Sequence, residues 1–250
     1  MDKLQIDKDK IIMELKEEAL SHVVMRHPYL SDLKSLSFCD NKKVLREFAE
    51  SYTNYSSHFP KYLTAVISKL EDPKHRLALI ENLTEESGIY SSEELSVLAS
   101  FGVDPEWIKG IAHPVLFKRF ALAVGADLRK KADLDVICWR EQFYQLLLTG
   151  SVEECLGALG LGTEFIVKPT YENFLPALEN SGISMEDYVF FPLHTLVDDH
   201  HNETIMEIIK DLIVDEASAE RVRKGMIKAL MLRCSYWDSM LDKQKRNLKK

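Results

Sequence analysis

The chain has few of the residues that interrupt helices, and it has no long apolar run. Its 250 residues include only 10 glycines and 8 prolines, a composition that favours long helices over a turn-rich β-sandwich. No stretch approaches the roughly 18 consecutive apolar residues of a membrane span, and residues 1–8 lack the apolar segment of a signal peptide. We therefore expect a soluble globular protein of the cytoplasm that does not bind membranes.

Excess positive charge and paired cysteines are also missing. The formal net charge of −8 argues against binding of nucleic acid, because attraction to phosphate requires a basic surface. The 4 cysteines show no Cys-x-x-Cys spacing, so we interpret them as reduced thiols rather than as a disulfide framework. The basic tail at residues 243–250 is interpreted as a frayed helix end rather than as a nucleic-acid arm.

The chain does contain helical periodicity along almost its whole length. Hydrophobic residues make up 46% of the sequence, and they recur at spacings of three and four with almost no alternation of period two. We expect a single all-α domain over residues 1–250, with its core at about 20–242 and roughly eight to ten helices. The predicted helices cover residues 6–25, 41–56, 60–70, 74–87, 93–101, 104–110, 114–123, 133–148, 151–178 with a kink at Pro169, a segment from 184 onward, and 217–242.

Three side chains that can bind metals lie close together in the last third of the chain. His194, Asp198 and His201 are spaced i, i+4 and i+7. On one α-helix, at about 100° per residue, they project within an arc of roughly 60°. Two imidazoles and a carboxylate form the mixed nitrogen and oxygen set that suits iron, manganese or zinc. A solvated polar face is the alternative, and the neighbouring His200 should point elsewhere.

Two acidic residues end the helix predicted at residues 74–87. Glu86 shares a face with Leu79 and Leu83, so its carboxylate is expected to point inward. A buried carboxylate is costly without a partner, which favours a metal or an ion pair. Glu85 lies next to that face and stays open as the alternative ligand, and a solvated acidic helix end is the other interpretation.

Two further positions carry ionisable side chains among apolar neighbours. His113 precedes Pro114, and a histidine there commonly caps the helix that begins at the proline. Glu164 stands before the proline kink, surrounded by residues such as Leu161 and Phe165. An exposed acid is the ordinary interpretation of a single glutamate, and these apolar surroundings weaken it.

Taken in order, these motifs resemble a known family. Asn-Leu-x-Glu-Glu-x-Gly at 82–88, His-x-x-Leu-Phe-x-Arg-Phe at 113–120, a glutamate before a proline, and His-x3-Asp-x2-His at 194–201 are similar to the haem-oxygenase-like metal oxidases. These are also called iron-containing redox enzymes, or haem-oxygenase-like di-iron oxygenases. Their relatives in fold include pyrroloquinoline-quinone synthase, type II thiaminase and the Chlamydia protein associating with death domains. The resemblance covers roughly residues 20–242 and implies a haem-oxygenase-like helical bundle.

The resemblance also implies a function. A family member would bind two iron ions, with manganese as a possible substitute, and would use O2 to oxidise a small organic metabolite. It would be a homodimer. The ligands implied by the matching positions are Glu86 (or Glu85), His113, Glu164, His194, Asp198 and His201.

The sequence departs from the family pattern at two places. Residues 89–112 form an extra stretch between the second and third motifs, which we interpret as a lid or as one wall of a substrate pocket. The Chlamydia relative has a tyrosine where this chain has Thr163, so chemistry that consumes such a tyrosine does not carry over. Several other tyrosines are candidates to line the cavity, although aromatic residues at helical spacing are more often core: Tyr29, Tyr52, Tyr55, Tyr62 and Tyr171.

Two other classes of function remain open. One is a cofactor-free or single-metal enzyme that resembles the quinone synthase or the thiaminase. The other is a non-enzymatic protein that binds partners through a helical surface. Iron content distinguishes the first from a di-iron enzyme, and tolerance to loss of His194 and Asp198 distinguishes the second.

Overall fold

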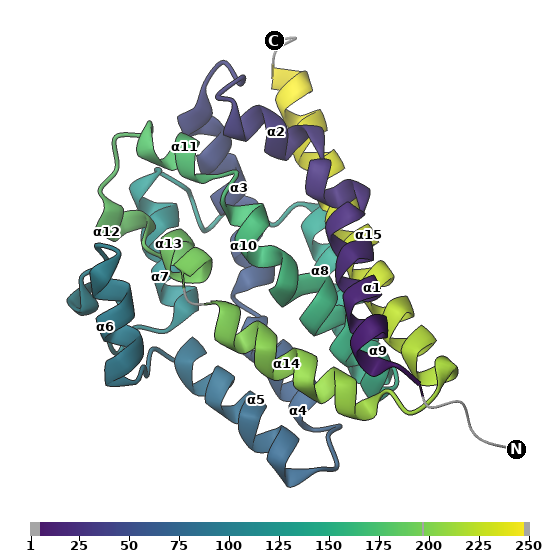
Figure 1. Ribbon diagram of the computed structural model, residues 1–250. Coiled ribbons are helices and arrows are strands. Elements are labelled where there is room, and N and C mark those ends of the chain that lie inside the picture. The colour runs from purple at the N-terminus through teal and green to yellow at the C-terminus, as the bar shows by residue number, and fades with distance from the viewer. Residues whose placement is uncertain (1–5, 197, 248–250) are drawn as a thin grey trace, which may run out of the picture.

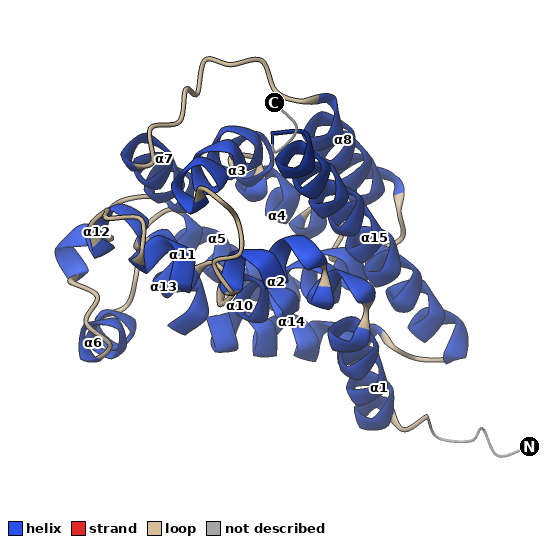
Figure 2. Cartoon of the chain, turned by 90° about the horizontal axis from the view of Figure 1, so that it is seen from above, coloured by secondary structure: helices blue, strands red, loops and turns tan. Residues whose placement is uncertain are grey.

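The structure is a computed structural model that describes residues 6–196 and 198–247, with the backbone alone at 198–201. Helices form all of the regular secondary structure within these residues (Figure 2). The elements are α1 (Lys8–Ser21), η1 (Val23–Arg26), α2 (Pro28–Lys34), α3 (Asn41–Ser56), α4 (Phe59–Ile67), α5 (Pro73–Glu86), α6 (Ser92–Ser100), η2 (Pro105–Trp107), α7 (His113–Ala123), α8 (Leu134–Thr149), α9 (Val152–Leu156), η3 (Gly157–Glu164), α10 (Phe165–Tyr171), α11 (Leu175–Glu179), α12 (Met185–Tyr188), α13 (Phe190–Leu196), α14 (Asp198–Leu212) and α15 (Glu216–Asn247).

Local sequence accounts for many of the helix ends. The side chain of Asp40 accepts a hydrogen bond from the backbone of Lys43 at the start of α3, and Ser91 forms a capping box with Glu94 at the start of α6. Such caps satisfy backbone N–H groups that have no partner inside the helix. Gly88 ends α5 with a φ of 87°, the left-handed conformation that glycine adopts without strain.

Three of the predicted helices are divided in the structure. The stretch at 6–25 becomes α1 and η1, because the His22 side chain accepts a hydrogen bond from the backbone of Val24. The segment from 184 onward contains α12, α13 and α14. The predicted helix at 151–178 contains α9, the π-helix η3, α10 and α11, and Pro169 lies inside α10. The single kinked helix was therefore a wrong prediction.

Close packing of glycines explains the irregular course of η3. A Cβ added at Gly157 would overlap the carbonyl oxygen of Val222 in α15, and one at Gly162 would lie 2.6 Å from Cβ of Ala229. Side chains at these positions would keep the two backbones apart. The approach brings η3 against the long C-terminal helix α15, which runs along one side of the molecule (Figure 1).

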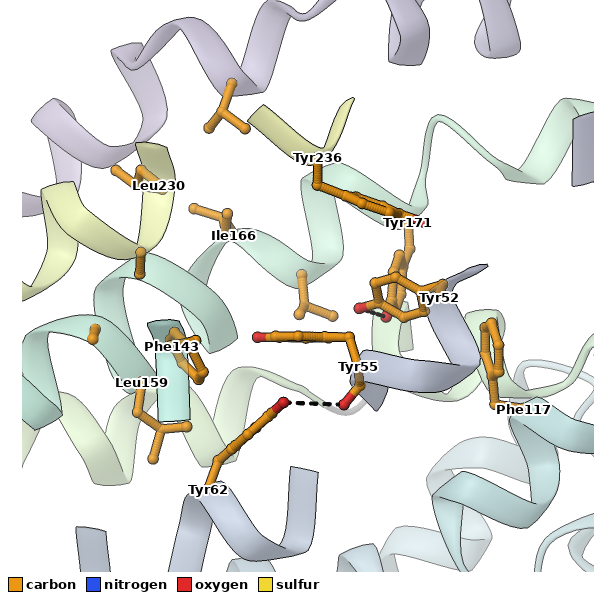
Figure 3. Close-up of a cluster of buried hydrophobic side chains, with 14 of the residues drawn as sticks. Tyr52, Tyr55, Tyr62, Phe117, Phe143, Leu159, Ile166, Tyr171, Leu230 and Tyr236 are labelled. Atoms are coloured by element: carbon orange, nitrogen blue, oxygen red, sulfur yellow. Dashed lines mark hydrogen bonds between the residues drawn. The ribbon is translucent and has the colours of Figure 1, made fainter. Parts of the chain in front are cut away.

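The centre of the bundle is rich in aromatic rings. Tyr55 stacks on Trp139 with ring centroids 3.7 Å apart, and Tyr52 forms a hydrogen bond of 2.9 Å with Tyr171. Figure 3 shows the hydroxyl groups of Tyr52 and Tyr171 meeting, and the hydroxyl of Tyr62 donating to the backbone carbonyl of Tyr55. Arg233 is 1% exposed and lies over the rings of Tyr55 and Trp139. The core thus combines apolar packing with a set of buried polar groups.

The search for membrane-spanning helices gives a negative result for the described part of the chain. None of its helices has the length and apolar character to cross a bilayer.

Candidate metal centre

Four of the predicted ligands line one buried cavity. Glu86, His113, Glu164 and His194 are 5%, 5%, 4% and 8% exposed, and they come from α5, α7, η3 and α13. The cavity has a volume of about 30 Å³. Its other lining residues are Tyr52, Tyr55, Ser56, Phe59, Pro114, Thr163, Val167, Tyr171 and Phe190. Fold topology therefore brings together groups that are far apart in the sequence.

Glu86 and Glu85 point in different directions from the end of α5. Glu86 is buried and lines the cavity, whereas Glu85 is partly exposed and lines a separate outer groove. The carboxylate with access to the centre is that of Glu86, as its position on the face of Leu79 indicated. This geometry favours Glu86 over Glu85 as the ligand.

His113 lies beside Glu86 and does not cap its helix. The N-cap of α7 is Ala112, and His113 is the first helical residue. Its Nδ1 lies 2.9 Å from Oε1 of Glu86, but this nitrogen makes no hydrogen bond of good geometry among the described residues. Two atoms that bind one ion at about 2.1 Å and at right angles are themselves about 3 Å apart. The pair therefore has the spacing of two ligand atoms.

The other ring nitrogen of His113 has a partner outside the predicted ligand set. The hydroxyl of Tyr90 lies 2.7 Å from Nε2. Burial, together with the nearby Glu86 carboxylate, raises the pKa of Tyr90 above its ordinary value, so the phenol is neutral at physiological pH. A neutral hydroxyl can accept a hydrogen bond from Nε2–H while Nδ1 faces the cavity.

His194 is oriented by the backbone of its own helix. Its Nδ1 lies 2.6 Å from the carbonyl oxygen of Phe190, and a carbonyl only accepts, so Nδ1 carries the proton. The lone pair is then on Nε2, the nitrogen available to an ion. Glu86, His113 and His194 each have one potential ligand atom within 4.8 Å of those of the other two. The two imidazole rings meet edge to face, with centroids 4.8 Å apart.

Glu164 is buried rather than exposed. It is the last residue of the π-helix η3 and is 4% exposed. π-Helical turns are rare and frequently occur at functional sites, because the extra residue changes the direction of a side chain. The glycines at 157, 160 and 162 were the sequence feature that could have indicated this close-packed segment.

The prediction for Asp198 and His201 is not tested by the structure. Their side chains, and that of His200, lie outside the described residues. Leu196 is the last described residue of α13 and Asp198 the first of α14, and residue 197 between them lies outside the described residues, so the single helix expected across 194–201 stays a prediction.

Three of the candidate tyrosines line the cavity and two do not. Tyr52, Tyr55 and Tyr171 are lining residues, and the Tyr171 ring lies edge-on to that of His194 with centroids 5.7 Å apart. Tyr29 and Tyr62 are fully buried core residues. Burial raises the pKa of Tyr55, opposed by the charge of Arg233. Three phenol side chains therefore form part of the cavity wall.

The donor set fits a metal centre. Carboxylates buried among apolar side chains need a compensating positive charge, and two carboxylates with two imidazoles form a set that suits iron or manganese. The Glu86 carboxylate and Nδ1 of His113 lie close enough together to bind the same ion.

Comparison with known proteins identifies the family. A model of the iron-containing redox enzymes matches residues 46–234, which is most of the chain. The protein belongs to this family. Its fold is the haem-oxygenase-like helical fold: it superposes with a TM-score of 0.66 on a protein of that fold from Shewanella denitrificans, with 15% identity, over 95% of this chain and 91% of the other.

Two characterised relatives are enzymes that make small organic compounds. The 4-aminobenzoate synthase of Chlamydia trachomatis is 25% identical over 206 residues, which are 80% of each chain. The 4-chloro-allylglycine synthase of Streptantibioticus cattleyicolor is 23% identical over 223 residues, which are 88% of this chain and 78% of the relative. The family and these relatives indicate an enzyme that uses iron.

Proposed function

We propose that this protein is a non-haem di-iron oxidase or oxygenase that uses O2 to oxidise a small organic metabolite. The main support is the convergence of Glu86, His113, Glu164 and His194 on one buried cavity in a chain of the iron-containing redox family. Asp198 and His201 complete the proposed ligand set. Three carboxylates and three imidazoles can bind two divalent ions with little net charge left over.

Each part of the site has a proposed role. The carboxylates and imidazoles hold the ions, which supply the redox chemistry when bound. The carbonyl of Phe190 keeps the proton of His194 on Nδ1. The Tyr52–Tyr171 hydroxyl pair supplies hydrogen-bonding groups at the cavity wall that can orient a substrate. The surrounding rings exclude water from the reacting groups.

The relatives suggest the kind of substrate. Both are named for products that contain an amine and a carboxylate, 4-aminobenzoate and 4-chloro-allylglycine. We propose a substrate of comparable size that carries one or both of these groups. As a further part of this proposal, the protein is a homodimer, which light scattering of the purified protein would test.

The first experiment is a count of iron atoms. The chain is purified anaerobically, supplied with ferrous iron, separated from unbound ions and analysed for iron per chain. Two irons per chain, with oxygen consumption by the ferrous protein, is the expected result. One iron per chain would support a single-metal enzyme, and none would support a cofactor-free enzyme or a binding protein.

The change His201→Ala tests the part of the ligand set that the geometry does not cover. The variant should lose stable binding of two irons, because one ligand is removed from the set, while its helix content measured by circular dichroism stays close to wild type. His200→Ala is the matched control, since it removes a neighbouring imidazole outside the proposed set. If His201→Ala binds the same number of irons as wild type, His201 is not a ligand.

A further inference from the structure

A large groove lies next to the buried cavity. It has a volume of about 890 Å³ and is lined by residues of α5 and α6, with Leu196 of α13 and Glu203 of α14. Its lining includes the sequence neighbours of the proposed ligands, since Glu85 precedes Glu86 and Leu196 follows His194 by two residues. The groove therefore reaches the outer side of the candidate metal centre.

Tyr90 stands between the groove and the cavity. It belongs to the lining of the groove, while its hydroxyl lies 2.7 Å from Nε2 of His113, a lining residue of the cavity. The Tyr90 and His113 rings are nearly parallel, at 22°, with centroids 6.1 Å apart. One side chain thus contacts both spaces.

The cavity alone cannot hold an organic substrate. Its volume of about 30 Å³ is about twice the roughly 10–15 Å³ that one water molecule needs, and far below the roughly 150 Å³ of a cavity that binds benzene. A metabolite with several non-hydrogen atoms requires a larger space next to the ions. The groove is large enough, and Tyr90 in its lining contacts His113 of the cavity.

The two ends of the segment that carries Tyr90 are in close contact. Residues 89–112 leave α5 and return to α7, and a hydrogen bond of 2.8 Å from N–H of Gly110 to the carbonyl of Gly88 joins the two ends. A Cβ at Gly88 would lie 2.5 Å from the backbone nitrogen of Ile111. These contacts fix the points at which the segment leaves α5 and returns to α7.

We propose that the groove between α5 and α6 is the entrance to the metal centre, and that Tyr90 is both its gate and a positioning residue for His113. This inference rests on the proposed function, because it takes Nδ1 of His113 to be the ligand atom. The hydrogen bond at Nε2 holds the imidazole with Nδ1 toward Glu86. The ring of Tyr90 covers the route from outside.

The charge of the groove is consistent with the passage of cations. Its described lining contains five glutamates and no lysine or arginine: Glu81, Glu85, Glu93, Glu94 and Glu203. Clustered carboxylates raise the local concentration of cations, and this effect weakens as salt increases. The rate at which ferrous iron enters the centre should therefore fall as ionic strength rises.

The positioning role is tested by Tyr90→Phe, which removes the hydroxyl and keeps the ring. Loss of such a supporting hydrogen bond typically weakens metal binding by about 10-fold to 100-fold. Anaerobic titration with ferrous iron should give a loss of affinity in that range, and Tyr144→Phe, a half-buried tyrosine on α8, should bind as wild type. Equal affinity in both variants would overturn the positioning role.

The gating role is tested by Tyr90→Ala in the iron-loaded protein. The probe is the rate at which a bulky ferrous chelator removes the bound iron. Removal should be faster in Tyr90→Ala than in Tyr90→Phe, because only the first change removes the ring. Equal rates in the two variants, or a loading rate that does not change with salt, would contradict the groove as the entrance.

A readout without metal separates this inference from the proposed function. The imidazole ¹⁵N resonances of His113 in the iron-free protein should shift in Tyr90→Phe and stay unchanged in Tyr144→Phe. If wild type binds no iron, the proposed function fails, yet these resonances still report whether Tyr90 holds His113. Unshifted resonances in Tyr90→Phe would overturn the inference in that case as well.

Discussion

Buried carboxylates dominate the candidate centre at the scale of single residues. Glu86 and Glu164 are 5% and 4% exposed, and a carboxylate that leaves water needs a cation or several hydrogen bonds to remain charged. In the tautomer with the proton on Nε2, His113 turns a lone pair toward Glu86 and adds no positive charge. A bound divalent ion would supply the compensating charge, which is why the donor set and its burial point to the same chemistry.

The two adjacent glutamates at the end of α5 allow the ligand assignment to be tested with a matched pair of substitutions. Glu86→Gln should abolish stable binding of two irons, because it removes a charged ligand from the cavity. Glu85→Gln changes the same charge in the outer groove and should keep the full stoichiometry. Iron analysis of both variants, compared with wild type, gives the answer. Loss of iron in Glu85→Gln with retention in Glu86→Gln would reverse the ligand assignment.

Sequence reasoning could anticipate some of these residues and not others. The inward direction of Glu86 followed from its spacing to Leu79 and Leu83, because helical periodicity fixes which face a residue occupies. The contact of Tyr90 with His113 spans 23 residues and crosses α6 and η2. No local period encodes a contact of that kind, so Tyr90 could not be found from the sequence alone.

At the scale of elements, helix boundaries set by local sequence could be predicted, whereas those set by contact with another helix could not. The bounds of α3, Asn41–Ser56, coincide with the predicted range, since its apolar stripe and its Asp40 cap are both local features. The segment 151–178 differs because its form depends on α15. Glycines that permit contact with Val222 and Ala229 are recognisable as such only once the partner helix is in place.

The close contact between η3 and α15 predicts that replacing Gly157 by alanine lowers the free energy of unfolding. Gly157→Ala would put a methyl group onto the carbonyl of Val222, and overpacking of this kind typically costs about 1–3 kcal/mol. Urea denaturation should show a lower free energy of unfolding of that size. Ser235→Ala, at an exposed position of α15, is the control and should change stability little. A fully stable Gly157→Ala would mean that η3 and α15 are not in close contact.

The centre is a property of the whole molecule because its residues come from four separate elements. Glu86 and His194 belong to α5 and α13 and are brought to one cavity with His113 and Glu164 only when the bundle is folded. An ion that binds them should stabilise the folded state over the unfolded chain, in which no such site exists.

Thermal unfolding provides the corresponding measurement. With free ferrous iron at about 100 times its dissociation constant, binding contributes about 2.7 kcal/mol, and a protein of this size should melt about 5–10 °C higher. A chelator should reverse the increase, and His113→Ala should show none. The increase should also shrink at acidic pH, because ligands must lose their protons to bind metal. An equal rise in His113→Ala would place the bound ion elsewhere.

The wide separation of these side chains along the chain has a consequence for how the enzyme matures. A growing polypeptide that has emerged only as far as α7 or η3 has no place where the complete centre can form, since His194 has yet to be synthesised. Under the proposed function, the complete iron site can therefore form only after the chain has been made past His194 and its distant helices have packed together.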